Sequence, residues 1–124
     1  MSQHAEPSAG IDQLISLDTQ RVGSSHLVTV GGEVDMVTTP HLRGYLLRQV
    51  EQADATLVLD LRRVAFLGSS GLAVLVEILD LTRERDLALR LVCNSREVVR
   101  PLEATGLTEL FEIYPDPDAA LAAS

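Results

Sequence analysis

The sequence predicts an α/β protein, with a mixed, mostly parallel sheet of 4–5 strands backed by about four helices in a layered fold. Short apolar stretches typical of strands alternate along the chain with stretches whose apolar residues recur at helical spacing. Residues 56–61 are apolar almost throughout, which is typical of a strand buried on both faces of a parallel sheet. Two strand-like stretches separated by a turn come first and predict an initial hairpin.

The length of the chain predicts one domain. At 124 residues, it is large enough to bury most of its apolar surface without disulfides or metals. Residues 1–10 are small and polar, with glycine and proline, and we expect them to form a flexible tail. Residues 11–124 then form the single domain. Its core must be aliphatic, because the chain has two Phe, two Tyr and no Trp.

The first half of the domain predicts a hairpin, a helix and the central strand. Residues 14–19 and 26–30 are the two strands of the hairpin, and residues 23–25, Gly-Ser-Ser, are the turn between them. A Thr-Pro pair at 39–40 is a typical helix start and predicts a helix over about 40–53. The buried stretch at 56–61 follows as the central strand.

The next predicted helix, from Ser69 to about Arg85, carries two apolar stripes. At helical spacing, one stripe consists of Leu72, Leu75, Val76 and Leu79, and the other of Val74, Ile78 and Leu81. One stripe must face the sheet. The second stripe either packs on a neighbouring helix or forms a docking surface for a partner beside Ser69.

The last third of the chain predicts strand, helix, strand, helix. Residues 87–93 and 111–114 are the strands, and residues 115–123 form a terminal helix. Between the strands, a helix runs from Ser95 as its cap to Gly106 as its stop. Pro101 lies inside this helix, and we expect a kink or a late helix start there, because proline removes a hydrogen bond and clashes with the preceding turn.

Composition excludes several classes of function. The chain has 10 basic and 18 acidic residues and a net charge of −8, so phosphate backbones repel it and nucleic acid is not a partner. It has no apolar stretch of about 18 residues, no signal-peptide pattern and a single cysteine, Cys93, which we expect to be a buried, inert thiol. We therefore expect a cytoplasmic protein with no membrane partner. Nothing predicts a metal or a cofactor.

The glycine-flanked Ser69 and Ser70 are the strongest candidates for a functional site. Ser69 stands where an apolar stretch stops and a helix begins, so a phosphate on it would meet unpaired backbone N–H groups and a favourable helix dipole. Unmodified, its hydroxyl can cap the helix, which stabilises a helix by about 1 kcal/mol. The pattern alone leaves two interpretations open, a simple helix cap and a phosphorylation switch.

The sequence does not predict an enzyme. A hydrolase nucleophile elbow needs glycine both two places before and two places after the serine, and neither Ser69 nor Ser70 has both. The three histidines, His4, His26 and His41, lie in the tail, at a strand start and at a helix start. A Ser-His-Asp triad is therefore not expected.

Four segments, taken together, give the chain a family resemblance: residues 32–35 (Gly-Glu-Val-Asp), 58–61 (Val-Leu-Asp-Leu), 66–72 (Phe-Leu-Gly-Ser-Ser-Gly-Leu) and 105–107 (Thr-Gly-Leu). On these segments the chain resembles a STAS domain from about residue 14 to 118, and in size it is similar to bacterial anti-sigma factor antagonists. The resemblance implies binding without catalysis. It also implies that the unphosphorylated form binds an anti-sigma factor, usually a serine kinase, and that phosphorylation of one serine ends the binding.

The resemblance implies that Ser69 is the phosphorylated serine. The family usually has Asp just before this serine, where this chain has Gly68; the change removes a like charge beside the phosphate and permits a positive φ. The residues expected to bind the partner are Asp35, Met36, Thr38, Gly68, Ser69, Ser70, Gly71, Val74 and Ile78. A PP2C-type phosphatase is a further expected partner, and we expect a monomer or weak dimer.

Two alternatives stay open at this point. Asp35 either contacts the partner or is a turn aspartate that bonds its own backbone, whereas Asp60, at the end of the predicted central strand, is expected to be structural. For the whole chain, the alternative to a phosphorylated antagonist is a non-phosphorylated STAS scaffold subunit of a transporter or stress-sensing assembly. Gly68 is the residue that keeps this alternative open.

Overall fold

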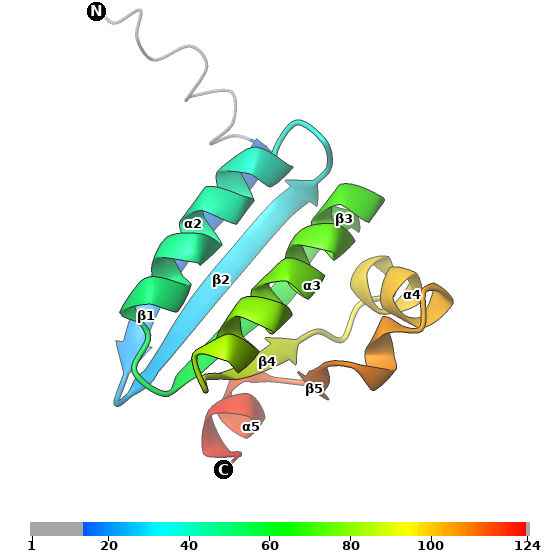
Figure 1. The fold of residues 1–124 in the computed structure, drawn as a ribbon. Coiled ribbons are helices and arrows are strands. Elements are labelled where there is room, and N and C mark those ends of the chain that lie inside the picture. The colour runs from blue at the N-terminus through cyan, green and yellow to red at the C-terminus, as the bar shows by residue number, and fades with distance from the viewer. Residues whose placement is uncertain (1–13, 124) are drawn as a thin grey trace, which may run out of the picture.

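The computed structural model describes residues 14–123 (Figure 1). A sheet of five strands in the order β1-β2-β3-β4-β5 forms its middle layer. The first two strands form an antiparallel hairpin, and all later neighbours are parallel. The strands are β1 (Ile15–Val22), β2 (Ser25–Val34), β3 (Thr56–Leu67), β4 (Ala88–Val92) and β5 (Glu112–Tyr114). The predicted mixed, mostly parallel sheet with an initial hairpin and a central third strand is confirmed, and the tail predicted over residues 1–10 lies outside the described residues.

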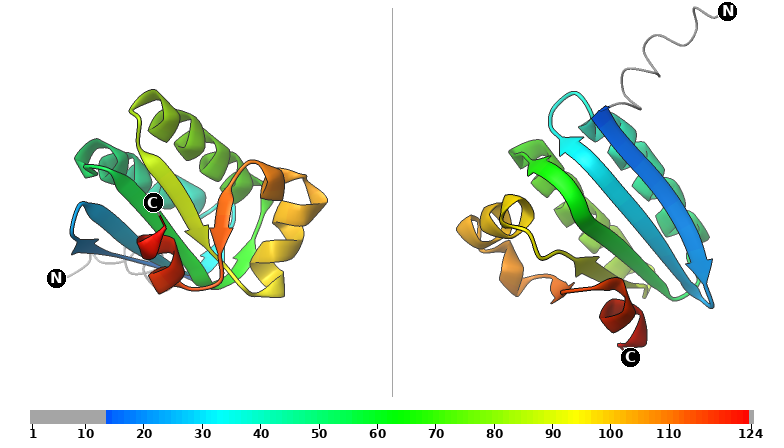
Figure 2. Two further views of the ribbon diagram at one scale, coloured as in Figure 1. Left: turned by 90° about the horizontal axis from the view of Figure 1, so that it is seen from below. Right: turned by 180° about the vertical axis from the view of Figure 1, so that it is seen from behind.

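Helices cover the two faces of the sheet unequally (Figure 2). The described helices are α2 (Thr39–Gln52), α3 (Ser69–Glu84), α4 (Arg96–Ala104) and α5 (Pro117–Ala122), with a short 3₁₀ turn at Leu107–Glu109. The first three of these helices share one aliphatic core with one face of the sheet. The short α5 packs on the other face, over the β3–β4 part of the sheet.

The side chains of β3 point alternately to the two faces of the sheet, and apolar residues on both faces explain why helices pack on both sides. Leu57, Leu59 and Leu61 belong to the large core under α2 and α3, whereas Val58 between them packs with Val92 and Ala120 under α5. Both faces of this stretch are therefore apolar, which is why the strand lacks the polar alternation of a surface strand.

β3 is longer than the strand predicted from the sequence. The predicted strand ended too early because two irregularities interrupt the alternation of buried and exposed side chains along β3. Between Thr29 and Gly31 of β2, and again between Gly32 and Glu33, β3 contains one extra residue relative to its partner. Such bulges change which face the following side chains take. The alternation expected of a strand is lost after residue 61, although the strand continues to Leu67.

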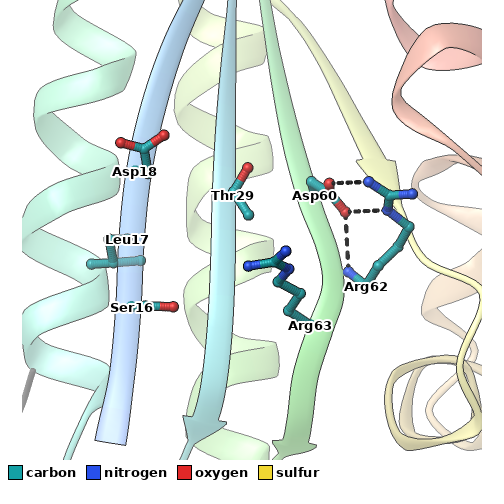
Figure 3. A pocket seen from close by; sticks show the side chains of 7 residues that line it. All are labelled: Ser16, Leu17, Asp18, Thr29, Asp60, Arg62 and Arg63. Carbon is teal, nitrogen blue, oxygen red and sulfur yellow. Dashed lines mark hydrogen bonds and ion pairs between the residues drawn. The ribbon is translucent and has the colours of Figure 1, made fainter. Parts of the chain in front are cut away.

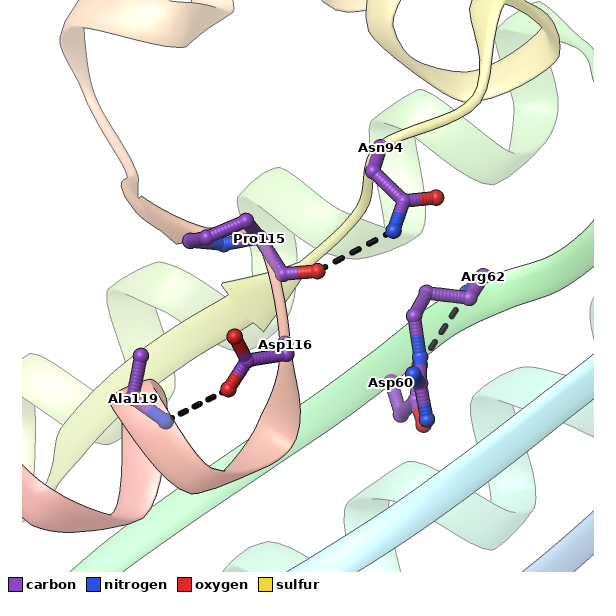
Figure 4. A network of polar contacts seen from close by, with 6 residues as sticks. All are labelled: Asp60, Arg62, Asn94, Pro115, Asp116 and Ala119. Atoms are coloured by element: carbon purple, nitrogen blue, oxygen red, sulfur yellow. Dashed lines mark hydrogen bonds and ion pairs between the residues drawn. The ribbon is translucent and has the colours of Figure 1, made fainter.

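The C-terminal elements match the prediction except at Pro101. Helix α4 begins at Arg96 with Pro101 inside it, so the expected late start is wrong. Gly106 follows the helix with a φ of 74°, the left-handed conformation that ends helices at glycine. Helix α5 is capped by Asp116, whose carboxylate accepts a hydrogen bond from the N–H of Ala119 at 2.8 Å (Figure 4).

Candidate partner-binding surface

Two loops meet at the carboxyl edge of the parallel strands. β2 and β3 end side by side, with Val34 opposite Leu67, and the N–H of Gly68 donates to the carbonyl oxygen of Val34 at 2.9 Å. The loop of residues 35–38, which leads into α2, therefore lies beside residues 68–71, which begin α3. The structure thus brings together the two segments that the resemblance implies for partner binding.

Side chains of the loop itself hold residues 35–38 in place. One carboxylate oxygen of Asp35 accepts hydrogen bonds from the N–H groups of Val37 at 2.9 Å and Thr38 at 3.1 Å. The hydroxyl of Thr38 donates to the carbonyl oxygen of Glu33 at 2.7 Å and accepts from the N–H of Asp35 at 3.0 Å. The prediction that Asp35 is a turn aspartate is confirmed. Thr38 is fully buried, so the prediction that it contacts a partner is wrong.

Gly68, not Ser69, occupies the cap position of α3. Gly68 has φ −90° and ψ 178°, no side chain bonds the first turn, and the first helical hydrogen bond runs from Leu72 N to Gly68 O at 3.1 Å. Gly68 does not use the positive φ that glycine permits, and the interpretation of Ser69 as a simple helix cap is wrong. Ser69 is instead the first residue of the helix, and its side chain is exposed. The hydroxyl is thus accessible beside a helix end that has no side-chain cap.

Ser70 links the start of α3 to the start of α2, and Gly71 lets α3 pack closely against the sheet. The Ser70 hydroxyl lies 2.9 Å from the hydroxyl of Thr39 at the start of α2, and Thr39 in turn donates to the carbonyl oxygen of Asp35. Gly71 is buried, and a Cβ there would lie 2.5 Å from a side-chain carbon of Val34. Gly71 was predicted to contact the partner directly; that prediction is wrong, because the helix packs against the sheet at this residue.

Three large apolar side chains are exposed at the same edge of the sheet as Ser69. Met36 is 83% exposed and Val37 62%, and Phe66, at the end of β3, is 52% exposed. Phe66 lies beside Gly68, since a Cβ on the glycine would be 3.2 Å from the Phe66 ring. We call these three side chains the apolar rim. Met36 was among the residues predicted to bind the partner, whereas Val37 and Phe66 were not, although Val37 adjoins Met36 and Phe66 lies just before the glycine-serine segment.

The second stripe of α3 is not a docking surface. Val74 is 4% exposed and Ile78 is completely buried, and both belong to the large core. Helix α2 packs alongside α3, as Figure 1 shows, and covers the helix on this side. The prediction that Val74 and Ile78 contact a partner is therefore wrong, and the alternative of packing on a neighbouring helix accounts for the stripe.

Ion pairing also joins the two helices. The guanidinium of Arg43 on α2 binds both carboxylate oxygens of Glu77 on α3, at 2.8 and 2.6 Å, and these bonds hold the pKa of Glu77 below its usual range. Both side chains are partly exposed, so solvent screens the pair and its contribution to stability is small. The pair adds to the apolar packing that holds the two helices side by side.

Family comparison agrees with this geometry. The model of the STAS domain matches residues 16–120. The chain belongs to the STAS domain family. The resemblance expected from the sequence is thereby confirmed, together with the layered α/β fold and the absence of an enzymatic role, since this family of antagonists consists of binding and regulatory domains.

Relatives of this STAS domain are named as antagonists of anti-sigma factors. It is 29% identical to the anti-sigma-B factor antagonist of Bacillus subtilis over 80% of this chain and 90% of the relative. A crystal structure of an anti-sigma factor antagonist from Mycobacterium paratuberculosis has a TM-score of 0.77 and 33% identity, covering 86% of this chain and 91% of that one. The unphosphorylated anti-sigma factor antagonist SpoIIAA shares the fold, with a TM-score of 0.71 and 17% identity over 85% of this chain and 93% of SpoIIAA.

His26 and Cys93, the other residues singled out in the sequence, are buried parts of the fold. His26 lies near the start of β2, at the opposite end of the sheet from Ser69, with its Nδ1 3.1 Å from an amide oxygen of Gln49; His4 lies outside the described residues. Cys93 is buried, and burial raises the pKa of its thiol to about 11, which confirms an inert thiol. Within residues 14–123 there is no cluster of potential metal ligands and no helix long and apolar enough to cross a membrane.

Proposed function

We propose that this STAS domain is an anti-sigma factor antagonist whose unphosphorylated form binds an anti-sigma factor of the serine-kinase type, and that phosphorylation of Ser69 ends the binding. One observation carries the proposal: an exposed hydroxyl at the first residue of α3 lies at the same edge of the sheet as the exposed apolar rim. Exposed apolar side chains gathered at one edge of a domain are typical of protein–protein contact sites. The names of the relatives supply the class of partner.

Ser69 is well placed for a charge to act on the complex without harming the domain. A phosphate of about −1.5 to −2 charges at the start of a helix is compatible with the helix dipole, so we expect the fold to survive. In a complex, the same phosphate would lie next to desolvated Met36, Val37 and Phe66. Desolvating a charge without a cationic partner costs several kcal/mol, and about 4 kcal/mol weakens an affinity roughly a thousandfold.

Gly68 fits this proposal. Its backbone lies in a region that any residue adopts, so the chain at this point does not need glycine. Without a carboxylate at the cap position, the unpaired N–H groups of the first turn stay open to a phosphate on Ser69. We therefore expect phosphorylation to proceed without the usual aspartate, with a PP2C-type phosphatase restoring the serine.

Labelling tests the switch. The protein is incubated with the serine-kinase anti-sigma factor of its own genome and ATP, and the phosphate is located by mass spectrometry. Ser69→Ala should abolish the label, whereas Ser70→Ala, the matched control at the neighbouring serine, should retain it. Equal labelling of Ser69→Ala would remove the site assignment. Absence of any label on a protein that still binds the kinase would instead favour the non-phosphorylated scaffold.

Binding measurements test the surface separately. Replacing Met36 or Phe66 by Ser should weaken the affinity for the anti-sigma factor at least about tenfold, since exposed apolar anchors of this kind contribute most of the energy in interfaces. Leu110→Ser is the control, because Leu110 is 47% exposed but lies in the segment between α4 and β5. If all three variants bind like the parent, the apolar rim is not the contact surface.

A further inference from the structure

The sheet face opposite α2 and α3 has a hollow that the proposed antagonist function does not use. Helix α5 covers only part of this face, and β1, β2 and much of β3 are left open (Figure 2). The hollow has a volume of about 460 Å³. It is lined by Ser16, Leu17, Asp18, Thr29, Asp60, Arg62 and Arg63 (Figure 3).

A bulge in β3 brings Arg63 into the hollow. Thr29 pairs with Asp60 and Gly31 pairs with Arg63, so β3 advances three residues where β2 advances two. In a regular strand, residues three apart point to opposite faces, whereas the extra residue turns Asp60 and Arg63 to the same face. Bulges occur often next to functional sites because they re-aim a side chain in this way.

Gly31 lies on β2 between two residues that line the hollow. It pairs with Ser16 on one side and with Arg63 on the other. A Cβ on Gly31 would lie 2.7 Å from the Ser16 hydroxyl and 3.3 Å from the Cβ of Arg63. Any larger residue at this position would therefore crowd two of the side chains that line the hollow.

The charges of the hollow are only half paired. Asp60 is 5% exposed and is satisfied by Arg62, whose guanidinium binds its two carboxylate oxygens at 3.0 and 2.9 Å beside the start of α5 (Figure 4). Asp18 on β1 and Arg63 on β3 have no ion-pair partner within residues 14–123. One carboxylate on β1 and one guanidinium on β3 thus remain, on either side of β2.

We propose that this hollow binds a small zwitterion with one carboxylate and one ammonium group, the chemistry of a free amino acid. Arg63 binds the carboxylate in a bidentate manner, Asp18 accepts from the ammonium group, and the hydroxyls of Ser16 and Thr29 bond the remaining polar atoms. The two Asp and two Arg of the hollow sum to no net charge, so a zwitterion leaves every charge paired. A simple anion would pair only with Arg63 and a simple cation only with Asp18, so each would form fewer charged hydrogen bonds than a zwitterion.

The spacing of the strands suits a ligand of this size. Asp18 and Arg63 are two strands and about two residues apart, which places their Cα atoms roughly 12 Å from each other. A long arginine side chain crosses much of that distance. Figure 3 shows the Arg63 side chain leaning from β3 towards β2, with its guanidinium between the two strands and below the level of Thr29.

Nuclear magnetic resonance titration of the full chain tests the proposal. A panel of free amino acids is added at up to about 10 mM, together with the N-acetyl form and the decarboxylated amine of each compound that binds. At least one amino acid should shift the amide resonances of Ser16, Thr29 and Gly31, and both derivatives should bind at least about tenfold more weakly. Asp18→Asn and Arg63→Gln should each weaken binding by a similar factor, whereas Arg83→Gln, an exposed arginine on α3, should not.

Three results would overturn the proposal. One is that no amino acid of the panel shifts these resonances; another is that the N-acetyl form binds as well as the free amino acid, which would indicate a simple anion site. The third is unchanged binding in both Asp18→Asn and Arg63→Gln. Both replaced side chains are exposed, so the variants should fold, and the amide spectrum of each variant verifies this directly.

Discussion

The two loops at the carboxyl edge of the sheet are built in opposite ways. Residues 35–38 are held by side chains, with the Asp35 carboxylate and the Thr38 hydroxyl bonding the backbone around them. Residues 68–71 depend instead on two glycines, which have no side chain. Gly71 lets α3 approach Val34, and Gly68 leaves the helix without a side-chain cap. The first loop presents apolar side chains from a rigid frame, and the second presents a hydroxyl from an uncapped helix end.

Gly71→Ala should have the largest effect of the changes that test this contrast. The new Cβ would lie 2.5 Å from a Val34 methyl carbon and 2.8 Å from one of Leu67, both of them buried, so the helix must shift. Overpacking of this kind lowers the free energy of unfolding by about 2–3 kcal/mol. The measurement is urea denaturation. Gly44→Ala in α2 is the control, because its Cβ meets no atom closer than 3.8 Å and should stabilise the helix by about 1 kcal/mol.

Thr38→Val comes next in size. Valine has nearly the same shape but no hydroxyl, so the carbonyl of Glu33 and the N–H of Asp35 lose a partner. We expect the free energy of unfolding to fall by about 1–2 kcal/mol, the usual range for unsatisfied buried groups. Thr38→Ser keeps the hydroxyl and should recover most of the loss. If valine and serine have equal effects, hydrogen bonding does not hold this loop.

Ser70→Ala tests the link between the two loops. It removes the hydrogen bond at 2.9 Å between the hydroxyls of Ser70 and Thr39, which is partly buried. A net loss of about 0.5–1 kcal/mol is expected in urea denaturation. Ser69→Ala should leave stability within about 0.5 kcal/mol of the parent, since that side chain is exposed. A larger effect at Ser69 would mean that its hydroxyl has a structural role after all.

Gly68→Asp should have the smallest effect, and of the opposite sign. A carboxylate at the cap position of α3 bonds the free N–H groups and interacts with the dipole, raising the free energy of unfolding by about 0.5 kcal/mol. Its pKa should be lowered by folding, so the gain is present above the unfolded pKa and disappears as the pH falls through the folded pKa. Gly68→Asn keeps the cap without the charge, and its effect should not vary over that pH range. Stability curves at several pH values measure both.

The fold was predictable where the apolar periodicity of a segment agrees with residues that start or end helices and turns. The hairpin, the Thr-Pro helix start and the glycine at 106 all combine a residue type with a local conformation. The two apolar stripes of α3 could be predicted from the sequence, but what each stripe packs against could not. Whether a second apolar stripe meets solvent or another helix depends on where α2 lies, and α2 is placed by tertiary packing that no local pattern contains.

The segments that form the site were predictable, but which of their side chains are exposed was not. Resemblance and residue type selected the segments around Asp35 and Ser69, and the parallel pairing of β2 and β3 brings them together. Which of their side chains are exposed depends on the bulges in β3 and on the buried hydroxyl of Thr38. For the same reason Phe66, turned outwards after the second bulge, could not be selected from alternation alone.

The order of the strands bears on how the protein folds during synthesis. Every strand pairs with its neighbour in the sequence, so no later strand has to insert between two that have already formed. A chain leaving the ribosome can therefore add one strand at a time to a growing edge, with contacts that stay close in sequence and favour fast folding. In the finished domain the last strand added is the short β5, and helix α5 follows it onto the opposite face as the closing step.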